Sequence, residues 1–260
     1  MRSLIIIFFL LSSDFYLNAQ NTAMVQIDGG VFLPLYGNGE KVKVEDFKMD
    51  VHPVTIEQYL EFLNQNPEWQ RSKVLRLFAD DNYLASWKGD LEPGEEHMPD
   101  APVTNVSWFA AKAYCKCQGK RLPTVDEWEY VAMASETQRD ARETEAYNKY
   151  ILSWYETPRT HDNQVRNTYK NIWGVYDLFG LVWEWPADFN SIMVEGETRD
   201  GGTGENNRFC DASAVTTTDM MNYAAFMRYA FRGSLKGNFS IKNLGFRCVQ
   251  DLKESKNMNI

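Results

Sequence analysis

The sequence has little histidine and little cysteine. Its 260 residues include three His, at positions 52, 97 and 161, and four Cys. Their spacing does not make a metal-binding motif, because one residue separates Cys115 from Cys117 where zinc knuckles have about two to four. The sequence therefore gives no sign of a zinc site or of another cluster of His and Cys ligands.

Positive charge and long apolar runs are also scarce. Lys and Arg number 27 against 36 Asp and Glu, which gives a formal net charge of -9. A chain this acidic has no evident affinity for phosphate backbones, so we expect no nucleic-acid partner. After the N-terminus, no segment reaches the roughly 20 apolar residues that a membrane-spanning helix needs. We therefore expect no transmembrane anchor.

Residues 1–19 have the layout of a secretory signal peptide. Arg2 precedes an apolar run from Leu4 to Leu11, and a short polar stretch follows that ends near Ala19. The run is too short for a transmembrane helix, so we expect cleavage near Ala19 rather than a retained anchor. The cleavage site has no Cys, which argues against a lipoprotein. The expected location is the periplasm or the extracellular space; the alternative for this segment is an apolar strand.

The cysteines predict disulfide bonds. Their number is even, and the chain is expected to leave the reducing cytosol, where disulfides are rare. The sequence pattern by itself does not decide how the four pair, and they are Cys115, Cys117, Cys210 and Cys248.

Three segments have the signals of helix starts. The capping box Thr55–Gln58 predicts a helix of about three turns that ends before Pro67. Ser107 precedes an apolar stripe at helical spacing, and Gly119 is the expected terminator. A second capping box, Thr124–Glu127, predicts a third helix.

The strand signals are short and dispersed, at 24–27, 231–232 and 246–249. Long stretches rich in Gly, Asn, Asp, Trp and Tyr separate the predicted elements. Such a chain needs aromatic packing, disulfides or ions to hold its irregular structure. The sequence has no internal repeats, so we predict a single domain with low regular secondary-structure content.

Residues 101–132 contain a Val-Ser-Trp helix start, then Ala-Tyr-Cys, Gly-Lys-Arg-Leu-Pro-Thr and Glu-Trp-Glu-Tyr. In this segment the chain resembles the formylglycine-generating enzyme family, also called sulfatase-modifying factors. The resemblance continues through the opening strand, first helix, central motif and C-terminal end, at residues 24–32, 54–62, 174–185, 231–234 and 243–248. The similar domain spans 24–250, and 251–260 form a C-terminal tail.

The resemblance implies an α+β fold of the formylglycine-generating-enzyme type, which is related to C-type lectins. Members of this family differ widely in activity, and they include copper-dependent oxidases of a sulfatase cysteine and accessory proteins. Because one fold supports several functions, membership does not by itself assign a reaction.

The oxidases of this family bind copper with two cysteines that lie about two dozen residues before the Asn-Leu-Gly-Phe-Arg motif. Counting back from Asn243, the matching positions are Asp219 and Ala224, and the stretch 211–247 contains no Cys. Cys210 alone cannot supply a two-sulfur site. We therefore assign no catalytic residue and do not expect formylglycine formation.

Two structural features are also implied by the resemblance. The first is a disulfide between Cys115 and Cys248. The second is a calcium site in the central motif, whose hard oxygen ligands suit Ca²⁺. Leu181 replaces the usual Asn beside these ligands, and the alternative is that the acids are ordinary turn and surface residues. The four ligand positions are Asp177, Gly180, Val182 and Glu184.

Methionines gather where the related oxidases bind copper. Thioethers are soft ligands that suit Cu(I), so this segment suggests a copper-holding site, with His161 as a further ligand. The competing interpretation, which we favour, is that flexible Met side chains fill the space of the missing cysteines. The residues are Met220, Met221 and Met227.

The sequence as a whole indicates an exported, non-catalytic accessory or binding protein. Its expected partner is a protein in the same compartment, either sulfatase-like or a copper oxidoreductase. The alternative is an oxidoreductase, of the formylglycine-generating type or another, with an altered active site.

Overall fold

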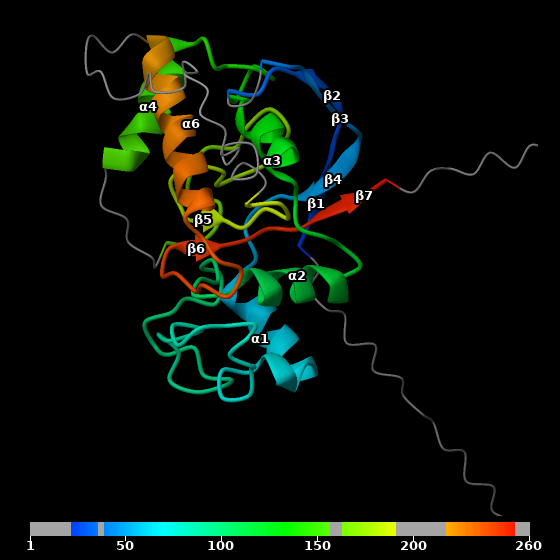
Figure 1. Cartoon of the computed structure of the whole chain (residues 1–260), viewed down its shortest axis with the longest axis vertical. Helices are drawn as coiled ribbons and strands as arrows, with labels where there is room; N and C mark the ends of the chain where they lie inside the picture. Colours follow the sequence, from blue (N-terminus) through cyan, green and yellow to red (C-terminus); the bar gives the residue numbers. More distant parts are fainter. Residues whose placement is uncertain (1–21, 36–38, 157–162, 191–216, 253–260) are drawn as a thin grey trace, which may run out of the picture.

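The computed structural model describes residues 22–35, 39–156, 163–190 and 217–252 (Figure 1). For residues 155–156 and 217–223 the description covers the backbone, not the side chains. Among the described residues, no helix has both the length and the apolar character needed to cross a membrane.

The beginning and the end of the described chain meet in one small antiparallel sheet. β1 (Met24–Ile27) pairs with β4 (Phe47–Asp50), and β4 pairs on its other edge with β7 (Val249–Asp251). The predicted strand at 24–27 is thus confirmed. Two further pairs are antiparallel β2 (Gly30–Phe32) with β3 (Val42–Val44), and parallel β5 (Trp183–Glu184) with β6 (Leu244–Gly245).

The three helices that the capping signals predict are present. The hydroxyl of Thr55 accepts the Gln58 backbone N–H at 3.3 Å, and the Gln58 side chain accepts the Thr55 N–H at 3.0 Å. The second helix ends just before Gly119, whose φ of +67° lies in the left-handed region that glycine adopts readily. The helices are α1 (Ile56–Gln65), α2 (Trp108–Cys117) and α3 (Val125–Ala132).

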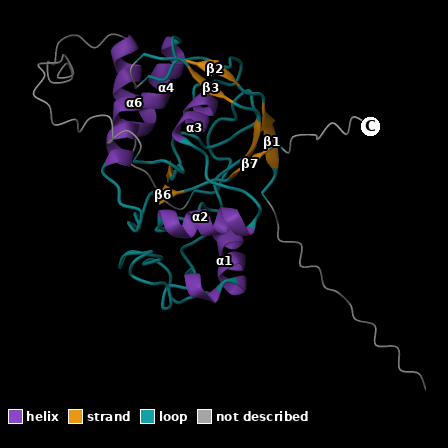
Figure 2. Ribbon diagram, turned by 45° about the vertical axis from the view of Figure 1, so that its right-hand side comes forward, coloured by secondary structure: helices purple, strands orange, loops and turns teal. Residues whose placement is uncertain are grey.

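Two longer helices, α4 (Glu145–Glu156) and α6 (Thr217–Gly233), lie side by side over α3 in both views (Figures 1 and 2). The predicted strand at 231–232 is therefore wrong, because these residues form the last turn of α6. The helical spacing places Arg228 and Arg232 on one face, where both contact the same carboxylate.

The predicted strand at 246–249 is only partly confirmed. Val249 begins β7, whereas the three residues before it connect β6 to β7 without belonging to either strand. They are nevertheless held on both sides, because the Phe246 carbonyl accepts the Val54 N–H and the Cys248 carbonyl accepts the Asp50 N–H, both at 2.9 Å.

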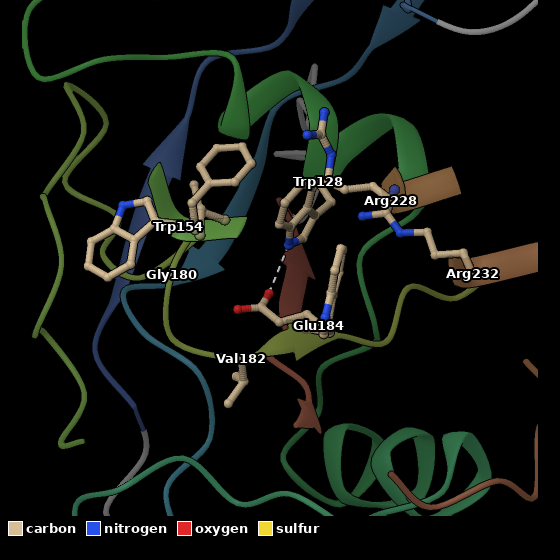
Figure 3. A pocket seen from close by; sticks show the side chains of 10 residues that line it. Trp128, Trp154, Gly180, Val182, Glu184, Arg228 and Arg232 are labelled. Carbon is tan, nitrogen blue, oxygen red and sulfur yellow. Dashed lines mark hydrogen bonds between the residues drawn. The ribbon is translucent and has the colours of Figure 1, made fainter. Parts of the chain in front are cut away.

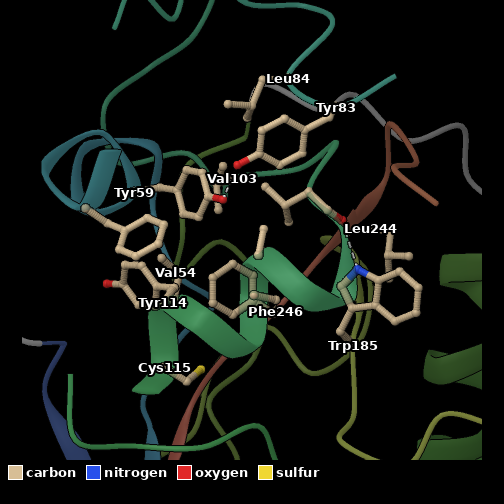
Figure 4. Packing of buried hydrophobic residues seen from close by; sticks show 14 of the residues in the cluster. Val54, Tyr59, Tyr83, Leu84, Val103, Tyr114, Cys115, Trp185, Leu244 and Phe246 are labelled. Atoms are coloured by element: carbon tan, nitrogen blue, oxygen red, sulfur yellow. Dashed lines mark hydrogen bonds between the residues drawn. The ribbon is translucent and has the colours of Figure 1, made fainter. Parts of the chain in front are cut away.

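Aromatic side chains form much of the core around α1 and α2. The rings of Tyr59, Tyr114 and Phe246 lie within about 6 Å of one another, and the Tyr59 hydroxyl contacts the Tyr83 hydroxyl at 2.6 Å (Figure 4). Trp185 is fully buried beside them. Between α1 and α2, residues 66–107 are largely irregular, so these rings supply packing that regular elements do not.

A second core lies between the strands and the helices α3, α4 and α6. Val131 and Ile151 are fully buried there, together with Ala224 of α6. The two cores meet at β5 and β6, where Glu184 pairs with Gly245 in parallel register. This junction holds the charged residues described next.

Candidate functional site

A buried carboxylate anchors α6 to α3. Glu129 of α3 is 8% exposed, and Arg228 and Arg232 of α6 are each 3% exposed. Arg228 donates to both oxygens of Glu129, at 3.0 and 2.7 Å, and Arg232 donates to one at 2.8 Å. Two arginines four residues apart on one helix face can share a carboxylate in this way.

The charge of Glu129 depends on these partners. Burial by itself would raise the pKa of Glu129, but the guanidinium groups of Arg228 and Arg232 outweigh burial and hold the pKa below its usual value. Glu129 is therefore ionised at neutral pH, and the trio has one excess positive charge.

A second buried pair lies at the junction of the two cores. Arg247 donates to the two oxygens of Glu184 at 2.7 and 2.8 Å, and both side chains are 0% exposed. The Trp128 indole N–H donates to Glu184 at 2.8 Å (Figure 3). Arg247 also donates to the carbonyls of Asp50 and Tyr176. This arginine thus connects four separate segments of the chain.

Trp128 connects the two charged groups. Its ring lies 4.8 Å from the guanidinium of Arg232, a cation–π contact, while its N–H faces Glu184 (Figure 3). The cavity between Trp128, Trp183 and the two arginines of α6 has a volume of about 20 Å³. That space suits about one water molecule and is too small for a substrate side chain. We call Glu129, Arg228, Arg232, Trp128, Glu184 and Arg247 the ionic network.

The two carboxylates among the implied calcium ligands, Asp177 and Glu184, both accept hydrogen bonds from protein donors. The buried carboxylate of Asp177 accepts the backbone N–H groups of Arg166 and Thr168. Both oxygens of Glu184 accept from Arg247. Both carboxylates are thus engaged within the protein, and the calcium site stays a prediction. Among the described residues no three His, Cys, Asp or Glu side chains gather as a metal site.

The positions that match the family's copper-binding cysteines lie on α6. Ala224 is fully buried in the second core. Met227 is half-buried. The side chains of Asp219, Met220 and Met221 lie outside the described residues, as do Cys210 and His161, so the copper prediction is not tested here.

The structure joins Cys115 of α2 to Cys248 in a disulfide, the pairing that the resemblance implies. Both residues are fully buried. Cys117 is exposed and belongs to no disulfide in the described part of the chain. Partial burial raises the pKa of its thiol and nearby Glu68 adds to the effect, so the reactive thiolate is disfavoured.

Sequence reasoning missed the paired charges. Glu127, two residues before Glu129, contacts a different arginine, Arg121. Sequence reasoning did not find the arginine partners of Glu129, because it assigned Arg232 to a strand. Two arginines at helical spacing within an apolar stretch were the available signal.

A further buried pair was also missed. Lys120 donates to Asp50 at 2.7 Å, and the Cys248 N–H donates to the same carboxylate at 3.0 Å. Burial raises the pKa of Asp50 to about 6, although Lys120 opposes the change. The acid and its lysine are 70 residues apart, so no local pattern reveals the contact.

Comparison with known proteins identifies the class to which this fold and site belong. The family model described as sulfatase-modifying factor enzyme 1-like domain matches residues 13–252. The chain belongs to this family of sulfatase-modifying factors. The structure of PvdO from Pseudomonas aeruginosa has the same fold, with a TM-score of 0.50 at 16% identity over 88% of this chain and 94% of PvdO.

Two relatives show how broadly the domain is used. The inactive C-alpha-formylglycine-generating enzyme 2 of Mus musculus is 28% identical, over 92% of this chain and 89% of the mouse protein. The serine/threonine-protein kinase pkn1 of Chlamydia caviae is 32% identical over 65% of this chain. That match spans 28% of the kinase's own length, so this chain corresponds to one part of a larger protein there.

Proposed function

We propose that this chain is a non-catalytic sulfatase-modifying-factor protein that acts as an accessory or binding protein. One observation carries the proposal: where the oxidases have their two copper-binding cysteines, this chain has Asp219 and Ala224. The methyl group of Ala224 is fully buried in the core, so this position presents no ligand atom. A site without thiolates lacks the soft ligands that hold Cu(I) in those enzymes.

The surroundings of α6 support the same proposal. Glu129 clamps the helix to α3 through Arg228 and Arg232. The cavity beneath it has room for about one water molecule. The similarity to a mouse protein named as inactive agrees with loss of the reaction. The described residues at this place thus serve to hold the scaffold together.

The proposed setting follows from the N-terminal segment. We place the protein in the periplasm or outside the cell, with residues 1–19 removed as a signal peptide. Its proposed partner is a protein of that compartment, a sulfatase or a copper oxidoreductase. The acidic surface implied by the net charge of -9 favours a partner with a basic face.

The decisive experiment measures both activity and binding. Mature protein is incubated with Cu(I), oxygen and a sulfatase-type peptide that contains a cysteine, and loss of the peptide thiol is followed by mass spectrometry. We expect no copper-dependent loss. In parallel, calorimetry with a purified sulfatase and a purified copper oxidoreductase should yield a complex with one of them. Copper-dependent turnover, or no complex with either, contradicts the proposal.

Metal analysis of protein purified from its native compartment tests whether the chain binds calcium or copper. A calcium site predicts that a chelator lowers the melting temperature and that added Ca²⁺ restores it. An unchanged melting temperature argues against calcium. Copper held by Met220, Met221 and Met227 predicts that Cu(I) is retained against a moderate chelator, and the triple Met→Leu variant is the matched control.

A further inference from the structure

A cavity of about 260 Å³ lies away from the ionic network, between the start of α1, the irregular segment before α2 and the segment before β6. Ile56, Trp87 and Pro102 supply its apolar wall. Ser86 and Thr104 add hydroxyl groups. Pockets for drug-sized ligands have about 300–1,000 Å³, so this cavity suits a smaller molecule.

The cavity wall is held by backbone hydrogen bonds from three directions. Ile56 donates to the carbonyl of Ala101 at 2.9 Å, and Asn105 donates to the carbonyl of Ile241 at 3.1 Å. Leu84 in turn donates to the carbonyl of Asn105 at 2.9 Å. Leu84 and Asn105 both have positive φ, 47° and 55°, which is unusual for residues other than glycine. The surrounding structure therefore holds the wall in one preformed shape.

One polar atom of the cavity has no partner within the described part of the protein. The Nε2 atom of His97 is buried and makes no hydrogen bond there. It lies 3.9 Å from a carboxylate oxygen of Glu96, which is beyond hydrogen-bond distance. Buried polar atoms nearly always have a partner. An ammonium group in the cavity could donate to the Glu96 carboxylate, and a turn of the His97 ring toward the cavity would let a neutral imidazole accept from the same group.

The same cavity also contains a positive charge. Lys242, from the segment before β6, lines it together with Glu96. Its ammonium group is a donor for a carboxylate, and the hydroxyls of Ser86 and Thr104 are further donors in the cavity lining. Glu96 and Lys242 are both exposed to solvent. A simple anion would interact favourably with Lys242 only, and a metal cation with Glu96 only. A ligand with both charges matches both residues.

We propose that this cavity binds a free α-amino acid, with its ammonium group at Glu96 and His97 and its carboxylate at Lys242. The apolar side chain of the amino acid packs against Trp87 and Ile56. The proposal goes beyond the accessory function and does not depend on it, because none of these residues belongs to the ionic network or to the cysteine positions.

Calorimetry of the full mature chain with phenylalanine, leucine and serine as probes tests the proposal. We expect one binding site per chain. Phenylalanine and leucine should bind with higher affinity than serine. N-acetylphenylalanine lacks the ammonium charge, and phenylalaninamide lacks the carboxylate. A charge-assisted hydrogen bond is worth a factor of about 10 or more in affinity, so each analogue should bind at least about tenfold more weakly.

Two variants test the named residues. Glu96→Gln and Lys242→Met should each weaken phenylalanine binding about tenfold or more. Their controls are Glu95→Gln and Lys236→Met, which lie one and six residues away in sequence and are not among the residues that line the cavity. Both controls should bind phenylalanine as the unmodified chain does. The proposal fails if no amino acid binds, if the analogues bind as tightly as phenylalanine, or if glucose binds as well. It also fails if the controls lose affinity equally.

Discussion

The ionic network and the cavity beside α1 both contain charged side chains, but they use them differently. In the network every oxygen of Glu129 and Glu184 accepts a hydrogen bond from a buried arginine. In the cavity Glu96, His97 and Lys242 line open space, and the Nε2 atom of His97 has no partner among the described residues. Removing one partner of a charge pair inside the protein destabilises the fold, whereas charges that face a cavity can contact a ligand.

The comparison also separates the two regions by the space they offer. The space beneath α6 is lined by Trp128, Arg228 and Arg232 and has room for about one water molecule. The larger cavity is formed by other segments. Of these two, the larger cavity alone has room for a small ligand.

The largest expected effect comes from breaking the network at its centre. Glu129→Gln removes the buried negative charge that the guanidinium groups of Arg228 and Arg232 share, so we expect the unfolding free energy to fall by about 3–5 kcal/mol. Urea denaturation measures it. The control Glu145→Gln removes an exposed ion pair with Lys149 and should change nothing measurable. A loss below about 1 kcal/mol for Glu129→Gln would show that the network is not structural.

The pH dependence of the unfolding free energy distinguishes two buried acids, Glu129 and Asp50. The lowered pKa of Glu129 gives stability that is present above its unfolded value of 4.5 and is lost as pH falls through the folded pKa. Asp50 acts in the opposite sense. Its pKa rises from 3.8 to about 6, so its contribution is present below pH 3.8 and is lost as pH rises through about 6.

For Asp50 the change is about 3 kcal/mol, at about 1.4 kcal/mol for each pKa unit. Unfolding free energies between pH 4 and pH 7 should therefore depend less on pH in Asp50→Asn than in the unmodified chain. An identical pH dependence in the two proteins would mean that Asp50 titrates near its ordinary value.

A somewhat smaller loss is expected when the disulfide is removed. Cys115 and Cys248 are 133 residues apart, and their bond holds the segment that carries Arg247. Replacing both with Ala should cost about 2–4 kcal/mol, because the unfolded chain gains freedom. Thermal unfolding measures this loss of stability as a lower melting temperature, and Cys117→Ala, at an exposed cysteine, is the control. Equal melting temperatures would indicate that the network alone holds this segment.

The smallest effect on stability is expected in the cavity. Glu96→Gln and Lys242→Met change side chains that no buried partner depends on, so unfolding free energy should move by less than about 0.5 kcal/mol. The same variants should lose amino-acid binding. If either variant destabilises the protein as strongly as Glu129→Gln, the distinction between the two regions does not hold.

Local patterns predicted the beginnings of helices well. Thr55, Ser107 and Thr124 each satisfy backbone groups within three residues of themselves, so their effect can be seen in a short stretch of sequence. The same approach failed at Phe231 and Arg232. Their helix is stabilised by contacts with Glu129 about 100 residues away, which a local pattern cannot show.

The candidate sites could be predicted only in part. The absence of Cys from residues 211–247, which include Asp219 and Ala224, is visible in the sequence alone. The cavity was not predicted, because Ile56, His97 and Lys242 come from distant segments. The buried pair of Glu184 with Arg247 was not predicted either, although both lie in family motifs.

The sequence by itself determined the family, the helix starts and the lack of a two-cysteine site, because each depends on residue types at short or regular spacing. Only the tertiary structure decided which charges are paired and which face a cavity. Nothing in the local sequence distinguishes Glu129 from Glu96, yet folding buries Glu129 between two arginines and leaves Glu96 beside open space. That difference arises from the packing of distant segments, which decides whether an oppositely charged side chain lies next to a given acid.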